Sequence, residues 1–138
     1  MSFPPTKSLI PILLIGAFTS LSCGGDEPTA IEGRTLRLKL DEYRLMPQDV
    51  RVQAGRLRIV ATNVERLTHN VKIVHMDPDD SEAPPEEIGG TRSTQPGESA
   101  AVTFDDLEPG TYRLACTIAN HDDLGQYGDL IVEESQGK

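Results

Sequence analysis

Hydrophobic and polar positions alternate along much of the chain, and this alternation predicts short β-strands. Leu36, Leu38 and Leu40 alternate with Arg37 and Lys39, which is the two-residue period of a half-buried strand. Turn residues separate the runs, and no long helical stripe follows the first 22 residues. The pattern therefore predicts an all-β Greek-key sandwich or barrel. Further strands are predicted at 50–52, 57–61, 69–74, 102–104, 112–116 and 130–132.

Two segments lack this alternation. Residues 23–34 are dominated by Gly, Pro and acidic residues and are predicted to be a flexible tether. Residues 77–97 are also rich in acidic residues, Pro and Gly, and they are predicted to form a long exposed connection. Met46 and Met76, which lie outside both segments, are interpreted as ordinary packing residues.

The start of the chain has the features of an export signal. One positive charge precedes the apolar stretch 9–21, which is too short to span a bilayer and has the length of a signal-peptide core. Ser20 and Ser22 fit ordinary signal-peptidase cleavage, but the stretch also resembles a bacterial lipobox ending at Cys23. We expect residues 1–22 to be removed and Cys23 to carry a lipid, with free secretion as the alternative. The expected location is periplasmic or otherwise extracytoplasmic, at the membrane.

The charge balance narrows the choice of partners. The chain has 13 basic and 22 acidic residues and a formal net charge of −9. Nucleic-acid binding is disfavoured, because it needs a basic surface. Opposite fields steer encounter, so a protein partner with a basic docking face is expected, although solubility alone also explains the acidity.

Strand parity brings two metal-binding side chains toward the interior. His69 shares its face with Val71 and Ile73, and Cys116 shares its face with Leu114. The two can therefore meet at one end of a sandwich. The sequence also places His121 and Gln126 on the loop between the last two strands. Two imidazoles and one thiolate, with a weak axial ligand, are the donors of a blue-copper site.

Four stretches resemble the cupredoxin family, and the resemblance covers about residues 35–133. The segment CTIANHDDLGQYGDLIV (116–132) resembles the Cys-x4-His-x4-Met-x-Gly ligand loop of rusticyanin-like and plastocyanin-like members, and HNVKI (69–73) resembles the His-Asn element. The other two stretches are EYRLMPQDVRVQAGRLRIVATN (42–63) and QPGESAAVTFDDLEPGTYRLAC (95–116). A cupredoxin domain at 35–134 would leave residues 135–138 as a C-terminal tail.

The resemblance implies one type 1 copper ion and assigns the residues around it. His69, Cys116 and His121 match the equatorial ligands, and Asn70 matches the residue that ties the two ligand segments together. The departure is Gln126, which stands where most members have Met and resembles the axial Gln of stellacyanin-type sites. A hard amide oxygen favours Cu(II), so a lower reduction potential is expected than with Met.

The function implied is non-enzymatic transfer of single electrons. The expected partner is a redox protein of the cytochrome c, terminal oxidase or reductase type, with a membrane contact through the N-terminal lipid. Copper supply, storage or sensing is the main alternative, because it would use the same ligands. A hydrolase based on Cys116 and His121 is a weaker alternative, since no third orienting group is recognisable. Zinc could also occupy these ligands as an artefact.

Overall fold

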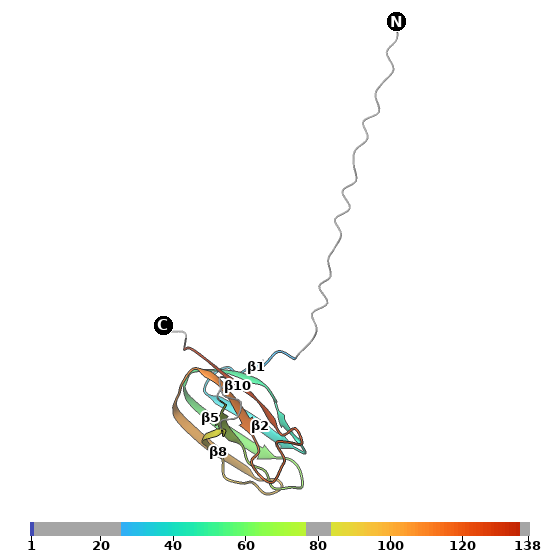
Figure 1. Cartoon of the computed structure of the whole chain (residues 1–138), viewed down its shortest axis with the longest axis vertical. Coiled ribbons are helices and arrows are strands. Elements are labelled where there is room, and N and C mark those ends of the chain that lie inside the picture. The colour runs from blue at the N-terminus through green and yellow to red at the C-terminus, as the bar shows by residue number, and fades with distance from the viewer. Residues whose placement is uncertain (2–25, 77–83, 136–138) are drawn as a thin grey trace.

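The domain is a sandwich of two β-sheets (Figure 1). The structure is a computed structural model, and it describes Met1 and residues 26–76 and 84–135. One sheet has four strands in the order β3-β2-β5-β8, and the other has six in the order β1-β4-β10-β9-β6-β7. The four-stranded sheet consists of β2 (Thr35–Asp41), β3 (Arg44–Met46), β5 (Gly55–Asn63) and β8 (Ser99–Leu107). The six-stranded sheet consists of β1 (Thr29–Ala30), β4 (Val50–Gln53), β6 (Lys72–His75), β7 (Glu86–Gly90), β9 (Gly110–Ala115) and β10 (Tyr127–Glu133).

Both sheets mix parallel and antiparallel pairs. β2 runs parallel to β5, and β4 runs parallel to β1 and β10, whereas the remaining pairs are antiparallel. The all-β architecture predicted from the sequence is thus confirmed. Within residues 26–76 and 84–135, no helix has the length and apolarity needed to cross a bilayer.

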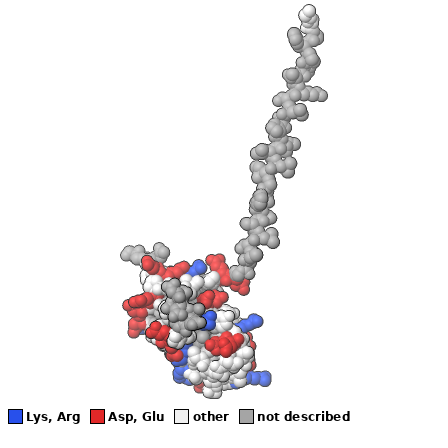
Figure 2. All heavy atoms as spheres, in the orientation of Figure 1, with Lys and Arg blue, Asp and Glu red and all other residues white. Residues whose placement is uncertain are grey.

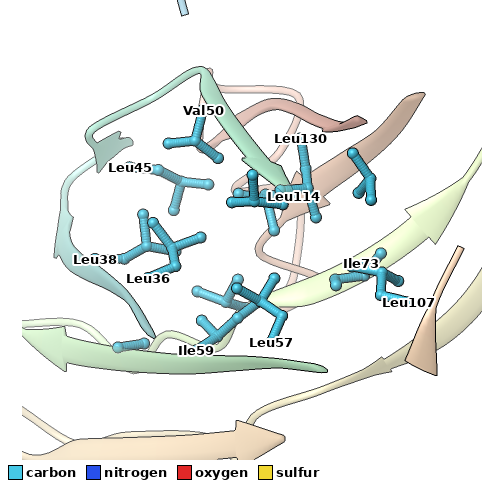
Figure 3. Packing of buried hydrophobic residues seen from close by; sticks show 14 of the residues in the cluster. Leu36, Leu38, Leu45, Val50, Leu57, Ile59, Ile73, Leu107, Leu114 and Leu130 are labelled. Atoms are coloured by element: carbon cyan, nitrogen blue, oxygen red, sulfur yellow. The ribbon is translucent and has the colours of Figure 1, made fainter. Parts of the chain in front are cut away.

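The core lies between the two sheets and is mainly aliphatic. Figure 3 shows Leu36 and Ile59 from one sheet and Leu114 and Leu130 from the other within the same cluster of buried side chains. These four residues are at most 1% exposed. Burying one such side chain contributes about 1.5–3 kcal/mol relative to leaving it exposed. The alternation of β2, in which every second residue is buried, is therefore what fixes its face against the core.

Several local features differ from the expectations. β7 lies inside the segment predicted to be an exposed connection, and β6 begins at Lys72, three residues later than predicted. β1 lies inside the predicted tether and pairs with β4. The interpretation of Met46 and Met76 as packing residues is wrong, because they are 39% and 38% exposed. Met46 lies on the edge strand β3, where the buried position is taken by Leu45.

Candidate metal centre

The ends of two neighbouring strands bring His69 and Cys116 together. β6 and β9 are antiparallel, with Lys72 opposite Ala115. The residues just before β6 therefore lie beside those just after β9, which is where His69 and Cys116 stand. An isolated β-bridge to Thr94 holds the backbone of His69 in place. We call this end of the sandwich the loop end.

The loop 116–126 adds two more side chains at the loop end. It connects β9 to β10 and carries His121 and Gln126. Backbone hydrogen bonds close it, because the Cys116 N–H donates to the Gln126 carbonyl at 3.0 Å and the Gln126 N–H donates to the His121 carbonyl at 3.0 Å. Gly125 has a φ of 111°, which side chains rarely tolerate. The glycine therefore allows the tight return into β10.

The three expected equatorial ligands form a compact buried group. The Cys116 sulfur lies 4.0 Å from Nδ1 of His69 and 3.6 Å from Nδ1 of His121. One ligand atom from each residue lies within 4.8 Å of the others. Cys116 and His69 have no exposed surface, while His121 keeps 8%. The site is therefore closed on the core side and approached through His121.

Burial also sets the protonation of His69. Loss of solvation lowers the pKa of its imidazole, and the neighbouring His121 acts in the same direction. A neutral imidazole has a free ring nitrogen lone pair, which is the form that binds a metal ion.

Gln126 is held with its amide in a defined orientation. Its Nε2 donates a 2.6 Å hydrogen bond to the backbone carbonyl of Asp41. Only the amide nitrogen can donate to a carbonyl, so this contact identifies the atom near Asp41 as Nε2 and the other as the oxygen Oε1. Among the described residues, the buried Oε1 of Gln126 and Nε2 of His69 have no hydrogen-bond partner. Buried polar atoms without partners cost free energy, and the amide oxygen is therefore available to a ligand.

Side-chain hydrogen bonds tie the ligand segments to one another. Asn70, next to His69, accepts a 2.9 Å bond from the Thr117 N–H and donates a 3.1 Å bond to the Thr117 hydroxyl. Thr117 in turn follows Cys116 directly. On the other side, the Thr94 hydroxyl donates to the His69 carbonyl at 3.0 Å. The backbone around the site is thus restrained without help from a bound ion.

The structure adds residues that the sequence did not indicate. The Tyr43 ring lies 5.1 Å from the His121 ring, between centroids. Asn63 is fully buried and donates to the carbonyls of Leu67 and Thr94 at 2.7 and 3.0 Å, which stabilises the segment leading to the first histidine. No local motif marks these roles, because the Tyr43–His121 and Asn63–Thr94 contacts join segments that are distant in the sequence.

One further histidine lies apart from this group. His75 is exposed, and its ring packs against Tyr112 at 5.8 Å. Cys23, the expected site of lipidation, lies outside the described residues, and so does the signal segment 2–22.

Comparison with known proteins finds similarity to solved structures. No family model matches the chain, and no relative was found among curated proteins. The fold is similar to dithionite-reduced auracyanin from Roseiflexus castenholzii, with 25% identity and a TM-score of 0.64 over 73% of this chain and 98% of that one. Auracyanin A, a "blue" copper protein from Chloroflexus aurantiacus, is 21% identical, with a TM-score of 0.61 over 75% of this chain and 99% of that one. Auracyanin B is 21% identical, with a TM-score of 0.55 over 80% of this chain and 93% of that one.

This is the cupredoxin fold. The buried His69, Cys116 and His121 fit a single type 1 copper, because a soft thiolate and two neutral imidazoles suit both oxidation states of that metal. The unpartnered Gln126 amide oxygen at the same end is consistent with a further, weaker donor. Together, the fold and this donor set support a blue copper protein.

Proposed function

We propose that the chain is an exported, lipid-anchored type 1 copper protein that carries single electrons between redox partners. The observation that carries the proposal is the buried group of Cys116, His69 and His121, with sulfur-to-nitrogen distances of 3.6 and 4.0 Å. These three residues would hold the ion, with the Gln126 amide oxygen as a further, weaker donor. Copper in such a site supplies a one-electron couple.

The protein's contribution is to keep the donors fixed while the charge changes. Asn70 restrains the backbone beside both His69 and Cys116 through Thr117. The Asp41 carbonyl holds the Gln126 amide. A framework that is already in place needs little rearrangement when an electron arrives or leaves. This property suits a carrier better than a copper donor, which must release its ion.

The exposed edge of His121 is the proposed route for the electron. It is the one member of the group with exposed surface, at 8%. Asp122 and Asp123 follow it directly, and Asp41, Glu42 and Glu65 are other acidic residues of this end of the domain. Acidic groups there favour a redox partner with a basic docking face.

A hydrolase role has less support than electron transfer. The Cys116 sulfur belongs to a residue with no exposed surface, so a substrate carbonyl has no path to it in the folded domain. The proposed anchor at Cys23 rests on the sequence, where a cysteine follows the apolar signal segment and precedes Gly24 and Gly25.

The visible spectrum after addition of Cu(II) tests the copper assignment. We expect an intense thiolate-to-copper charge-transfer band in the wild type and none in Cys116→Ser. A colourless wild-type protein would contradict the assignment. Reversible one-electron reduction of the coloured protein with fast self-exchange supports a carrier, whereas ready transfer of copper to another metal-free protein would instead support copper supply.

A further inference from the structure

The four-stranded sheet exposes a set of basic side chains on its outer side. The alternation that buries every second residue of β2, β3 and β5 places the basic residues between them outside. All four side chains are exposed. We call these residues the cationic face: Arg37, Lys39, Arg44 and Arg58.

The centre of the cationic face is apolar and slightly hollow. Lys39 lies opposite Met46 on one side, and Arg37 lies opposite Val60 on the other. A hollow of about 410 Å³ opens between these residues and Pro47. Met46 is 39% exposed. Apolar groups with cations around them are therefore presented together to whatever covers this sheet.

The basic side chains of the six-stranded sheet are arranged differently. There, Arg51 pairs with Glu133 at 3.1 Å and Lys72 pairs with Glu87 at 2.9 Å. Arg113 lies over the Tyr127 ring at 4.6 Å from its centroid. Among the residues that the structure describes, no member of the cationic face forms an ion pair.

This contrast is notable in a chain with 22 acidic and 13 basic residues. Arg37 and Lys39 are two positions apart on one strand, about 7 Å, so the sheet brings like charges together without neutralising them. Arg56 on the same sheet is paired with Asp105 at 3.9 Å, and the acidic Asp41 ends β2 beyond Lys39. In the view of Figure 2, Asp and Glu gather over the upper left of the domain, whereas Lys and Arg project at its right and lower edges. The charge is thus unevenly distributed.

The attachment of the domain favours a membrane as the occupant of the cationic face. β1 begins at Thr29, only six residues after Cys23, and pairs with β4 at the edge of the six-stranded sheet. Six residues reach at most about 20 Å. If Cys23 carries a lipid, as proposed above, the whole domain is therefore held close to the bilayer surface. The redox partner, in contrast, is expected at the acidic loop end.

We propose that the cationic face docks on an anionic lipid surface, with Met46 and Val60 toward the headgroups. Lys and Arg near such a surface contribute attraction that fades within a Debye length, about 8 Å at physiological salt. The two sheets are about 10 Å apart, so the acidic groups of the other sheet are largely screened from the membrane. A protein with a net charge of −9 can in this way still be drawn to a negative surface by one side. Docking would orient the domain with its six-stranded sheet toward solvent.

Vesicle binding tests the docking. All proteins carry Cys23→Ser, so that no acyl chain contributes and the N-terminal segment is the same in each. Binding is measured to vesicles of phosphatidylcholine alone and of phosphatidylcholine mixed with phosphatidylglycerol. We expect the triple variant Arg37→Gln, Lys39→Gln, Arg58→Gln to lose on the order of a hundredfold in binding to the anionic vesicles. The control triple variant Arg51→Gln, Lys72→Gln, Arg92→Gln has the same net charge and should lose no more than about twofold.

A fluorophore on either sheet reports the orientation. Ala101 of β8 is exposed and lies opposite Val60, and Thr111 of β9 is exposed on the other sheet. We expect a dye on Ala101→Cys to shift to shorter wavelength with anionic vesicles and a dye on Thr111→Cys to stay unchanged. Equal loss in both triple variants, or equal shifts of both dyes, would overturn the proposal. So would binding of poly-glutamate without binding of vesicles, since the occupant would then be an acidic protein.

These outcomes are separate from the test of copper binding. A protein that turns blue with Cu(II) but does not bind anionic vesicles refutes the docking alone. A colourless protein that binds them through the cationic face refutes the copper assignment alone.

Discussion

Asn70 offers the most direct test of how the site is held together. Its side chain is 6% exposed and makes two hydrogen bonds to Thr117, at 2.9 and 3.1 Å. Asn70→Ala removes both and leaves the Thr117 N–H without its acceptor. Each bond contributes about 1 kcal/mol, and Thr117 is exposed, so water can reach its N–H once the acceptor is gone. We therefore expect the free energy of unfolding of the metal-free protein to fall by about 2 kcal/mol.

The same change should loosen the copper site, because Asn70 and Thr117 adjoin His69 and Cys116. Urea denaturation followed by circular dichroism measures the stability, and a copper titration followed by visible absorption measures the affinity. The control Thr117→Val removes only the hydroxyl and keeps the N–H donor, so it should cost about 1 kcal/mol or less. The double variant should lose little more than Asn70→Ala alone. A loss below about 0.5 kcal/mol for Asn70→Ala would refute the reasoning.

Three further changes follow from the geometry of the site. Gln126→Met replaces a hard oxygen by a thioether, so the reduction potential should rise by at least about 59 mV. For a one-electron couple this equals a tenfold change in the affinity for Cu(I) relative to Cu(II). No change or a decrease in a redox titration would show that Gln126 is not a ligand. Because burial lowers the pKa of His69, the unfolded metal-free chain binds a proton there before the folded one does. Stability should therefore fall as the pH drops below about 6.5, by up to about 1.4 kcal/mol per pH unit, and His69→Gln should weaken this slope in denaturation curves between about pH 6.5 and 5. Gly128→Ala would drive its new Cβ into the backbone carbonyl of Gln48, so a loss of about 1–3 kcal/mol is expected, and an unchanged melting temperature would contradict the close approach.

The sequence predicted most of the sandwich because its strands bury one face. Leu36, Leu38 and Leu40 alternate with charged residues, and all three are at most 2% exposed in the structure. β7, by contrast, has no such signal. Its residues are Glu86–Gly90, and none of them is buried, so neither alternation nor hydrophobicity marks it as a strand. It forms because β6 offers an edge with which it can pair.

The candidate site was predictable in part for the same reason. Strand parity alone predicted that His69 and Cys116 point inward, and the spacing of the loop after Cys116 indicated His121 as the next ligand. The contact between Gln126 and the Asp41 carbonyl was not predictable, since it joins residues 85 positions apart through a backbone atom. The cationic face also escaped prediction, because net charge says nothing about which strands lie side by side.

The complete burial of Cys116 has a consequence for the life of the chain before it meets its metal. If the chain is exported, as we propose, it matures where thiols are readily oxidised. With no exposed surface on Cys116, the folded domain shields its own thiol from oxidants, from Cys23 and from other chains. Reagents can reach the sulfur only when the sandwich opens. Folding therefore protects the sulfur, and in an exported chain the interval before folding would be when the thiol is open to oxidation.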